Sequence, residues 1–116
     1  MKHLLKLEGM SKEAMLEILS STKNIKASRG ANEIKPLNAQ TWAMIFTKSS
    51  TRTRVSFEVG IRELGGSVMF LNANDMQLGR GEPIKDTARV LGRMVHGAVI
   101  RTYAQSDIEE FANLSN

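Results

Sequence analysis

The sequence of 116 residues contains no cysteine, and aromatic residues make up 5% of it. Without cysteine the chain forms no disulfide and has no thiolate nucleophile or metal ligand, which fits a reducing compartment. The few aromatic residues do not interleave with the basic ones, so the stacking platform of a nucleic-acid binder is missing. No apolar run has the length of a membrane span, and charges interrupt the start of the chain too early for a secretory signal. We therefore expect a cytoplasmic protein that binds neither nucleic acid nor membrane.

Several familiar patterns are also absent. The sequence has no internal repeat and no His/Asp/Glu spacing typical of a metal site, and its glycines form neither a Rossmann nor a Walker motif. Its hydrophobic content of 41% and charged content of 24% are those of an ordinary globular domain. The net charge is +4, but the basic residues are spread over several segments. This excess fits a small anionic ligand better than a nucleic acid.

Apolar residues recur at helical spacing in some segments and form a short, nearly continuous run at 41–47, as expected of a buried parallel strand. Ser11 can cap a first helix, and Gly65-Gly66 can end a later one. We predict helices at 11–27, at 53–64 and from 83 onward, and strands at 41–47, 67–71 and 98–103. A last helix is predicted to open with the capping box Ser106-Asp107-Ile108-Glu109. The apolar face of the third helix is predicted to consist of Ile84, Ala88, Leu91 and Val95.

The order of these elements, α and then β-α-β-α-β-α, predicts an α/β fold. Its parallel sheet would have flanking helices and right-handed crossovers. The polar stretch 72–82 is expected to be a long, mobile loop. A sheet of only three parallel strands, with two faces to cover, would be poorly buried. We therefore expect this domain to be incomplete and to continue beyond Asn116.

One run, Phe46-Thr47-Lys48-Ser49-Ser50-Thr51-Arg52-Thr53-Arg54, joins the first predicted strand to the following helix. Three hydroxyls and two guanidinium groups share positions 50–54, where a helix start leaves its N–H groups unpaired. These groups suit phosphate oxygens. The structural interpretations are N-capping by the hydroxyls and an ion pair of Arg54 with Glu58. The clustering favours a site for a phosphate-like anion.

A second arginine signal comes from the third predicted strand. Arg101 lies near its carboxyl end, and ligands of open α/β sheets sit at the carboxyl ends of the strands. Arg101 and the run at 46–54 should therefore meet at one edge of the sheet. His96, which precedes Gly97 near a helix end, is interpreted as a partner of the helix dipole rather than as a catalytic group.

These residues resemble the aspartate/ornithine carbamoyltransferase family. The stretch Ser50-Thr51-Arg52-Thr53-Arg54 is similar to the carbamoyl-phosphate signature of that family, and the resemblance covers nearly the whole chain. It continues through Ser56-Phe57-Glu58, Leu64-Gly65-Gly66 and Ile84-Lys85-Asp86-Thr87-Ala88-Arg89-Val90-Leu91-Gly92-Arg93-Met94. The last of these stretches resembles ornithine rather than aspartate carbamoyltransferases.

The resemblance implies a role for each matching residue. The phosphate of carbamoyl phosphate would be bound by Ser50, Thr51, Arg52 and Thr53. Thr53 and Arg101 would also reach the carbonyl oxygen, so that Arg52, Thr53 and Arg101 would be the catalytic residues. Gln77 matches a glutamine that members of the family extend into the site of a neighbouring subunit. The family further implies a homotrimer or a multiple of it.

The implied reaction is the attack of the side-chain amine of ornithine on carbamoyl phosphate, a step of arginine metabolism that gives citrulline and phosphate. It needs no metal and no organic cofactor. The family's His-Pro-x-Gln motif and its amino-acid-binding domain are absent from the 116 residues, so we expect the chain alone to be inactive. The acceptor could instead be putrescine, aspartate or an acylated ornithine. A non-catalytic anion-binding remnant is the other alternative.

Overall fold

The computed structural model describes residues 2–31, 34–72 and 84–115. The chain divides into two compact units, Met1–Ile34 and Lys35–Asn116. The first unit contains the helix α1, Lys12–Ala27. The hydroxyl oxygen of Ser11 accepts a hydrogen bond from the backbone N–H of Ala14 at 3.1 Å, which confirms the predicted helix start.

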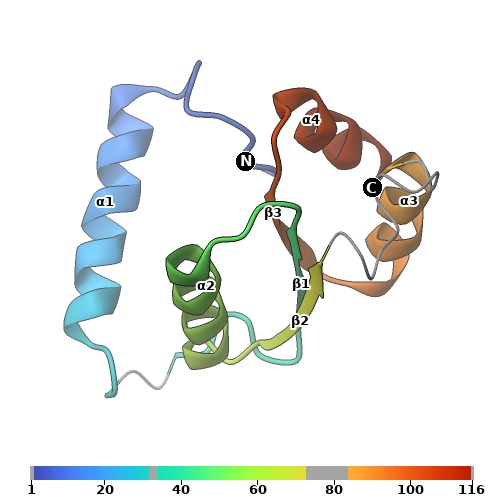
Figure 1. The fold of residues 1–116 in the computed structure, drawn as a ribbon. Helices are drawn as coiled ribbons and strands as arrows, with labels where there is room; N and C mark the ends of the chain where they lie inside the picture. The colour runs from blue at the N-terminus through green and yellow to red at the C-terminus, as the bar shows by residue number, and fades with distance from the viewer. Residues whose placement is uncertain (1, 32–33, 73–83, 116) are drawn as a thin grey trace. The chain divides into compact units, whose positions relative to one another are not determined.

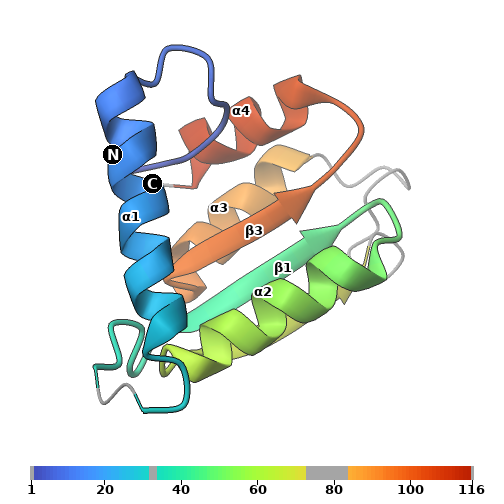
Figure 2. The same ribbon diagram turned by 90° about the vertical axis from the view of Figure 1, so that its left-hand side faces the viewer.

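The second unit is a three-stranded parallel sheet with helices on both faces (Figures 1 and 2). Its strand order is β2-β1-β3, which confirms the predicted α/β fold class. The strands are β1 (Thr41–Phe46), β2 (Ser67–Asn72) and β3 (Gly97–Arg101). The helices are α2 (Thr51–Glu63), α3 (Ile84–Met94) and α4 (Gln105–Leu114).

The strand order determines where the helices lie. The chain moves from β1 to β2 on one side and then returns past β1 to β3. Because both crossovers are right-handed, this reversal places α2 on one face and α3 on the other, as Figure 2 shows. The reversal falls between β1 and β3, and ligands of open α/β sheets bind at such a point, outside the carboxyl ends of the strands.

The core lies around β1, the central strand. Ala43 and Ile45 face α3 and α4, where they pack with Ala88 and Phe111. Leu91 and Val95 pack against the same cluster, as the predicted apolar face of the third helix requires. Four consecutive buried residues, 43–46, make β1 the strand that is covered on both faces.

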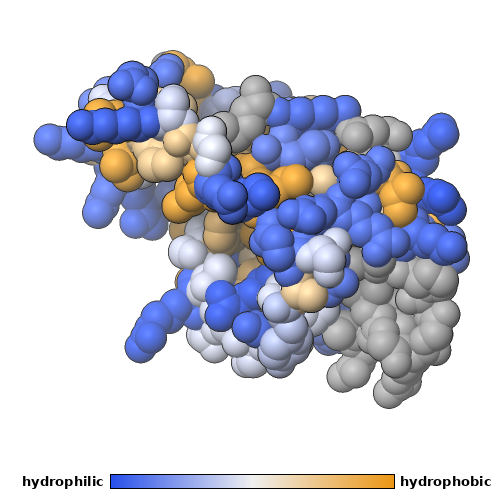
Figure 3. All heavy atoms as spheres, turned by 90° about the horizontal axis from the view of Figure 1, so that it is seen from above, coloured by the Kyte–Doolittle hydropathy of each residue, from blue (hydrophilic) through white to orange (hydrophobic). Residues whose placement is uncertain are grey.

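Much of the surface is polar. Figure 3 shows hydrophilic side chains over most of one face, with hydrophobic side chains between them. Several apolar residues of α2, such as Val55 and Phe57, remain exposed. Among the helices of the described ranges, none is long and apolar enough to cross a lipid bilayer.

The structure corrects the predicted capping box at 106–109. Helix α4 begins at Gln105, with its N-cap at Ala104, two residues before Ser106, and no side chain caps it. The backbone N–H of Asp107 donates to the carbonyl of Ala104, so Ser106 lies inside the first turn of the helix. The carboxylate of Asp107 accepts instead from the hydroxyl of Thr102 at 3.2 Å. The local pattern was right about a helix but wrong about its cap.

His96 also differs from its interpretation. It lies beyond the end of α3, and its Nδ1 accepts a hydrogen bond from the backbone N–H of Thr41 at 3.1 Å. The backbone N–H of His96 donates to the carbonyl of Thr41. These hydrogen bonds connect His96 to Thr41 rather than to the carbonyl groups at the end of α3. His96 therefore joins the start of β1 to the start of β3.

Candidate anion-binding site

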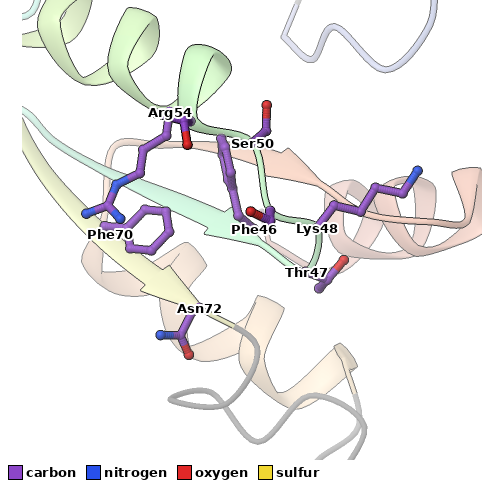
Figure 4. Close-up of a pocket in the computed structure, with 9 residues that line it drawn as sticks. Phe46, Thr47, Lys48, Ser50, Arg54, Phe70 and Asn72 are labelled. Atoms are coloured by element: carbon purple, nitrogen blue, oxygen red, sulfur yellow. The ribbon is translucent and has the colours of Figure 1, made fainter.

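An open pocket of about 390 Å³ lies where β1 and β2 end and α2 begins (Figure 4). Its lining combines hydroxyls, cationic side chains and two aromatic rings. The lining residues are Phe46, Thr47, Lys48, Ser49, Ser50, Thr51, Arg54, Phe70 and Asn72. The pocket is therefore built from the end of the central strand, the turn predicted to bind an anion and the end of the neighbouring strand.

At the start of α2, no capping side chain and no acidic residue competes with an anion for the backbone N–H groups. Ser50 occupies the N-cap position, but its side chain makes no capping hydrogen bond. The first turn contains no acidic residue, whereas the first turns of α1, α3 and α4 contain Glu13, Asp86 and Asp107. The helix ladder begins with the N–H of Arg54, which donates to the carbonyl of Ser50 at 3.0 Å. The preceding N–H groups and the helix dipole are thus available to an anion.

Two cationic side chains of the pocket lie over aromatic rings. The Nζ atom of Lys48 lies 4.6 Å from the centroid of the Tyr103 ring. The Cζ atom of Arg54 lies 3.6 Å from the centroid of the Phe70 ring. Figure 4 shows Arg54 reaching from α2 toward Phe70, while Lys48 extends the other way. The pocket therefore has positive charge at two separate places.

Arg101 is held next to the end of β1. Its carbonyl oxygen accepts from the backbone N–H of Thr47 at 2.9 Å and from the hydroxyl of Thr47 at 3.2 Å. The parallel register pairs Phe46 with Arg101. The carboxyl ends of β1 and β3 therefore meet at the edge of the sheet where the turn between β1 and α2 begins, as the sequence predicted.

The predicted site residues do not all line this pocket. Ser50 and Thr51 line it. Arg52 and Thr53 belong to the same first turn of α2 but are not among the lining residues. The exposed Arg101 is at the end of β3. Gln77 lies outside the described residues. The roles assigned to these residues stay predictions.

The structure adds Phe70 and Asn72, both in β2, to the run at 46–54 that the sequence analysis placed at the site. Asn72 ends β2 opposite Phe46 in the register, and Thr47 and Lys48 of that run lie in the loop after β1. The signal for Asn72 was its position at the carboxyl end of a predicted parallel strand. The ion pair of Arg54 with Glu58 is present, with 4.0 Å between Nε and Oε2. Within the described ranges, no group of three or more His, Asp or Glu side chains is arranged to hold a metal ion.

A parallel α/β sheet whose central strand leads into an uncapped helix start rich in hydroxyls and arginines defines a phosphate-type anion-binding domain. The family model of the aspartate/ornithine carbamoyltransferase carbamoyl-P binding domain matches residues 2–116. This chain belongs to that family.

Individual relatives agree with this assignment. The chain is 62% identical to the ornithine carbamoyltransferase of Akkermansia muciniphila over 115 residues, which are 99% of this chain and 38% of the relative. The structure of the anabolic ornithine carbamoyltransferase from Campylobacter jejuni matches with a TM-score of 0.90 and 46% identity, covering 100% of this chain and 37% of that one. The catalytic subunit of M. jannaschii aspartate transcarbamoylase matches with a TM-score of 0.89 and 30% identity, covering 100% of this chain and 39% of that one. The chain thus spans about 38% of the length of the curated relatives it matches.

Proposed function

We propose that this chain supplies the carbamoyl-phosphate site of an enzyme that carbamoylates the side-chain amine of ornithine. The observation that carries the proposal is the start of α2, where the Ser50 side chain makes no capping hydrogen bond and the first turn contains no acidic residue. The family assignment supports carbamoyl phosphate as the anion. Ornithine is favoured over aspartate because relatives that are 49–62% identical to this chain are named ornithine carbamoyltransferase.

In the proposed reaction, the neutral amine attacks the carbonyl carbon of carbamoyl phosphate. A C–N bond forms, and negative charge develops on the carbonyl oxygen. The C–O bond to phosphate then breaks, phosphate leaves with the electron pair, and the amine loses a proton. Arg52, Thr53 and Arg101 would stabilise the developing charge, and each such donor is worth roughly 3 kcal/mol in a preorganised site. Holding both substrates in line supplies further rate enhancement.

The phosphate would be held at the first turn of α2. Its backbone N–H groups and the hydroxyls of Ser50, Thr51 and Thr53 are donors, and Arg52 adds a planar guanidinium. Negative charge in this turn is favoured by the helix dipole, and no acidic side chain competes for it. The same donors serve the leaving phosphate as its charge increases.

We also propose that the active site is shared between subunits of a homotrimer or a multiple of it. In this proposal residues 1–116 are part of a carbamoyl-phosphate domain. The acceptor-binding residues are expected elsewhere, because the relatives are more than twice as long as this chain. Gln77 would enter a neighbouring site. Sedimentation equilibrium of the whole protein tests the assembly, and a monomer with full activity would contradict it.

A panel of acceptors tests the reaction. We expect the whole protein to form citrulline and phosphate from carbamoyl phosphate and ornithine. Putrescine, aspartate and an acylated ornithine should be poor acceptors. Preferred turnover of one of these three would replace ornithine as the substrate, and phosphate binding without any turnover would identify a non-catalytic anion-binding domain. Residues 1–116 alone should produce no citrulline.

A further inference from the structure

The first turn of α2 has to be fixed in place without the usual means. A capping side chain or an acidic residue would stabilise it, but either would also occupy the N–H groups that an anion needs. Ser50 makes no capping bond, and no acid is present. A turn that loosens when empty would lose anion affinity, since ordering it would oppose binding. Some other contact must therefore hold this turn.

Arg54 makes such a contact. Its backbone N–H closes the first turn by donating to the carbonyl of Ser50 at 3.0 Å. Its side chain leaves the helix and places Cζ 3.6 Å above the centroid of the Phe70 ring in β2. One residue thus joins the turn to itself through its backbone and to the sheet through its guanidinium (Figure 4).

The platform under Arg54 is itself fixed. The Phe70 ring meets the Phe46 ring edge-on, with centroids 5.7 Å apart and an interplanar angle of 64°. Phe46 is buried at the end of β1, with 5% of its surface exposed. The contacts therefore run from α2 through β2 to the central strand. Such edge-on ring pairs and cation–π contacts are both favourable.

The ion pair of Arg54 adds orientation but does not cancel its charge. The Nε atom of Arg54 is 4.0 Å from one oxygen of Glu58, whose other oxygen is 3.5 Å from Arg62. One carboxylate is thus shared by two guanidinium groups. The shared carboxylate therefore offsets the positive charge of Arg54 only in part. The remaining positive potential next to the pocket attracts an anion, and the Phe70 ring limits the movement of the guanidinium.

We propose that Arg54 is a positioning residue for the anion site. Its stack on Phe70 takes the place of a helix cap, so that the N–H groups and hydroxyls of 50–53 are already arranged for the phosphate. This inference rests on the proposed function, because it concerns the same site. It assigns to Arg54 a role through the turn rather than a direct bond to the ligand.

Calorimetric titration of the whole protein with inorganic phosphate and with carbamoyl phosphate tests this role. Phe70→Leu keeps the Arg54 charge but removes the ring, and we expect affinity to fall about threefold, as for a lost cation–π contact. Arg54→Gln should lower the affinity at least as much. The double variant Arg54→Gln with Phe70→Leu should bind only slightly more weakly than Arg54→Gln alone. Phe70→Tyr is the matched control, since it keeps the ring face and should keep the affinity.

Hydrogen exchange of the empty protein measures the order of the turn without any contribution from ligand binding. In the empty protein, the amides of residues 51–54 should exchange faster in Phe70→Leu than in Phe70→Tyr, while the amides of β1 stay protected. A loss of affinity in Arg54→Gln with normal affinity and exchange in Phe70→Leu would overturn the proposal, because Arg54 would then bind the anion directly. Normal affinity in both variants would also overturn it. Failure of the proposed function is a separate result, in which Arg52→Ala leaves phosphate and carbamoyl-phosphate affinity unchanged.

Discussion

The carbonyl oxygen of Arg101 accepts two hydrogen bonds from Thr47, one from the backbone N–H at 2.9 Å and one from the hydroxyl at 3.2 Å. The backbone bond continues the parallel pairing of β1 with β3 by one residue beyond Phe46. The hydroxyl bond is an addition that comes from the side chain alone. Together they hold Arg101 beside the loop that leads into α2, which is where the proposed reaction needs it.

Replacing Thr47 by valine removes the hydroxyl and keeps the branched shape. The backbone bond remains, so we expect the free energy of unfolding to fall by about 0.5–1.5 kcal/mol. Affinity for carbamoyl phosphate should fall as well, because Arg101 loses part of its support. Urea unfolding and calorimetric titration measure the two effects. Thr47→Ser should resemble the wild type, and a Thr47→Val protein that matches the wild type in both measurements would contradict this role.

Two serines at helix starts should respond differently to alanine. Ser11 caps α1 through a bond from Ala14, so Ser11→Ala should cost about 1 kcal/mol of stability. Ser50 makes no capping bond, so Ser50→Ala should change stability by less than about 0.5 kcal/mol. Only Ser50→Ala should weaken the binding of phosphate. Equal losses of stability in the two variants would show that Ser50 serves as an ordinary cap.

Two glycines of the second unit, at the start of β3 and inside α2, test its packing. A Cβ atom at Gly97 would lie 2.6 Å from the ring of Trp42, so Gly97→Ala should cost about 1–3 kcal/mol. A Cβ atom at Gly60, inside α2, would meet nothing within 4 Å, so Gly60→Ala should stabilise the protein by about 0.5–1 kcal/mol. Thermal unfolding of the two variants gives the comparison. A stabilised Gly97→Ala variant would contradict the observed approach of β3 to β1.

Most of the fold could be predicted from the sequence, because its signals are local. The apolar run that forms β1 and the cap at Ser11 each lie within a few residues, and both were placed within one residue of their observed bounds. The error at α4 shows the limit of local signals. The Ser106 pattern is compatible with a capping box, but Thr102 binds Asp107 and the helix starts after Ala104.

The site could be predicted only in part. The run at 50–54 shows its chemistry in its composition, and the end of β3 identifies Arg101. The stack of Arg54 on Phe70 could not be predicted in this way, because it depends on the register of β2 beside β1 and on how α2 crosses the sheet. Asn72 follows a predicted strand, so its place at this edge of the sheet could be predicted, but its position opposite Phe46 in the pocket depends on the same register. Contacts between elements need the three-dimensional arrangement.

The first turn of α2 is proposed to bind the phosphate of carbamoyl phosphate. Arg52 belongs to that turn, and a hydrogen bond between charged groups at such a site is worth about 1.5–3 kcal/mol. Arg62 is the matched control, because it lies on the same helix and its exposed guanidinium pairs with Glu58 outside the pocket. The two alanine variants therefore make the same chemical change at two ends of one helix.

The measurement is a calorimetric titration of the wild type, Arg52→Ala and Arg62→Ala with carbamoyl phosphate, with circular dichroism to confirm folding. Arg52→Ala should bind roughly 10- to 150-fold more weakly than the wild type, which corresponds to that hydrogen-bond energy. Arg62→Ala should bind nearly as well as the wild type. Unchanged affinity in a folded Arg52→Ala protein would contradict the assignment of the site.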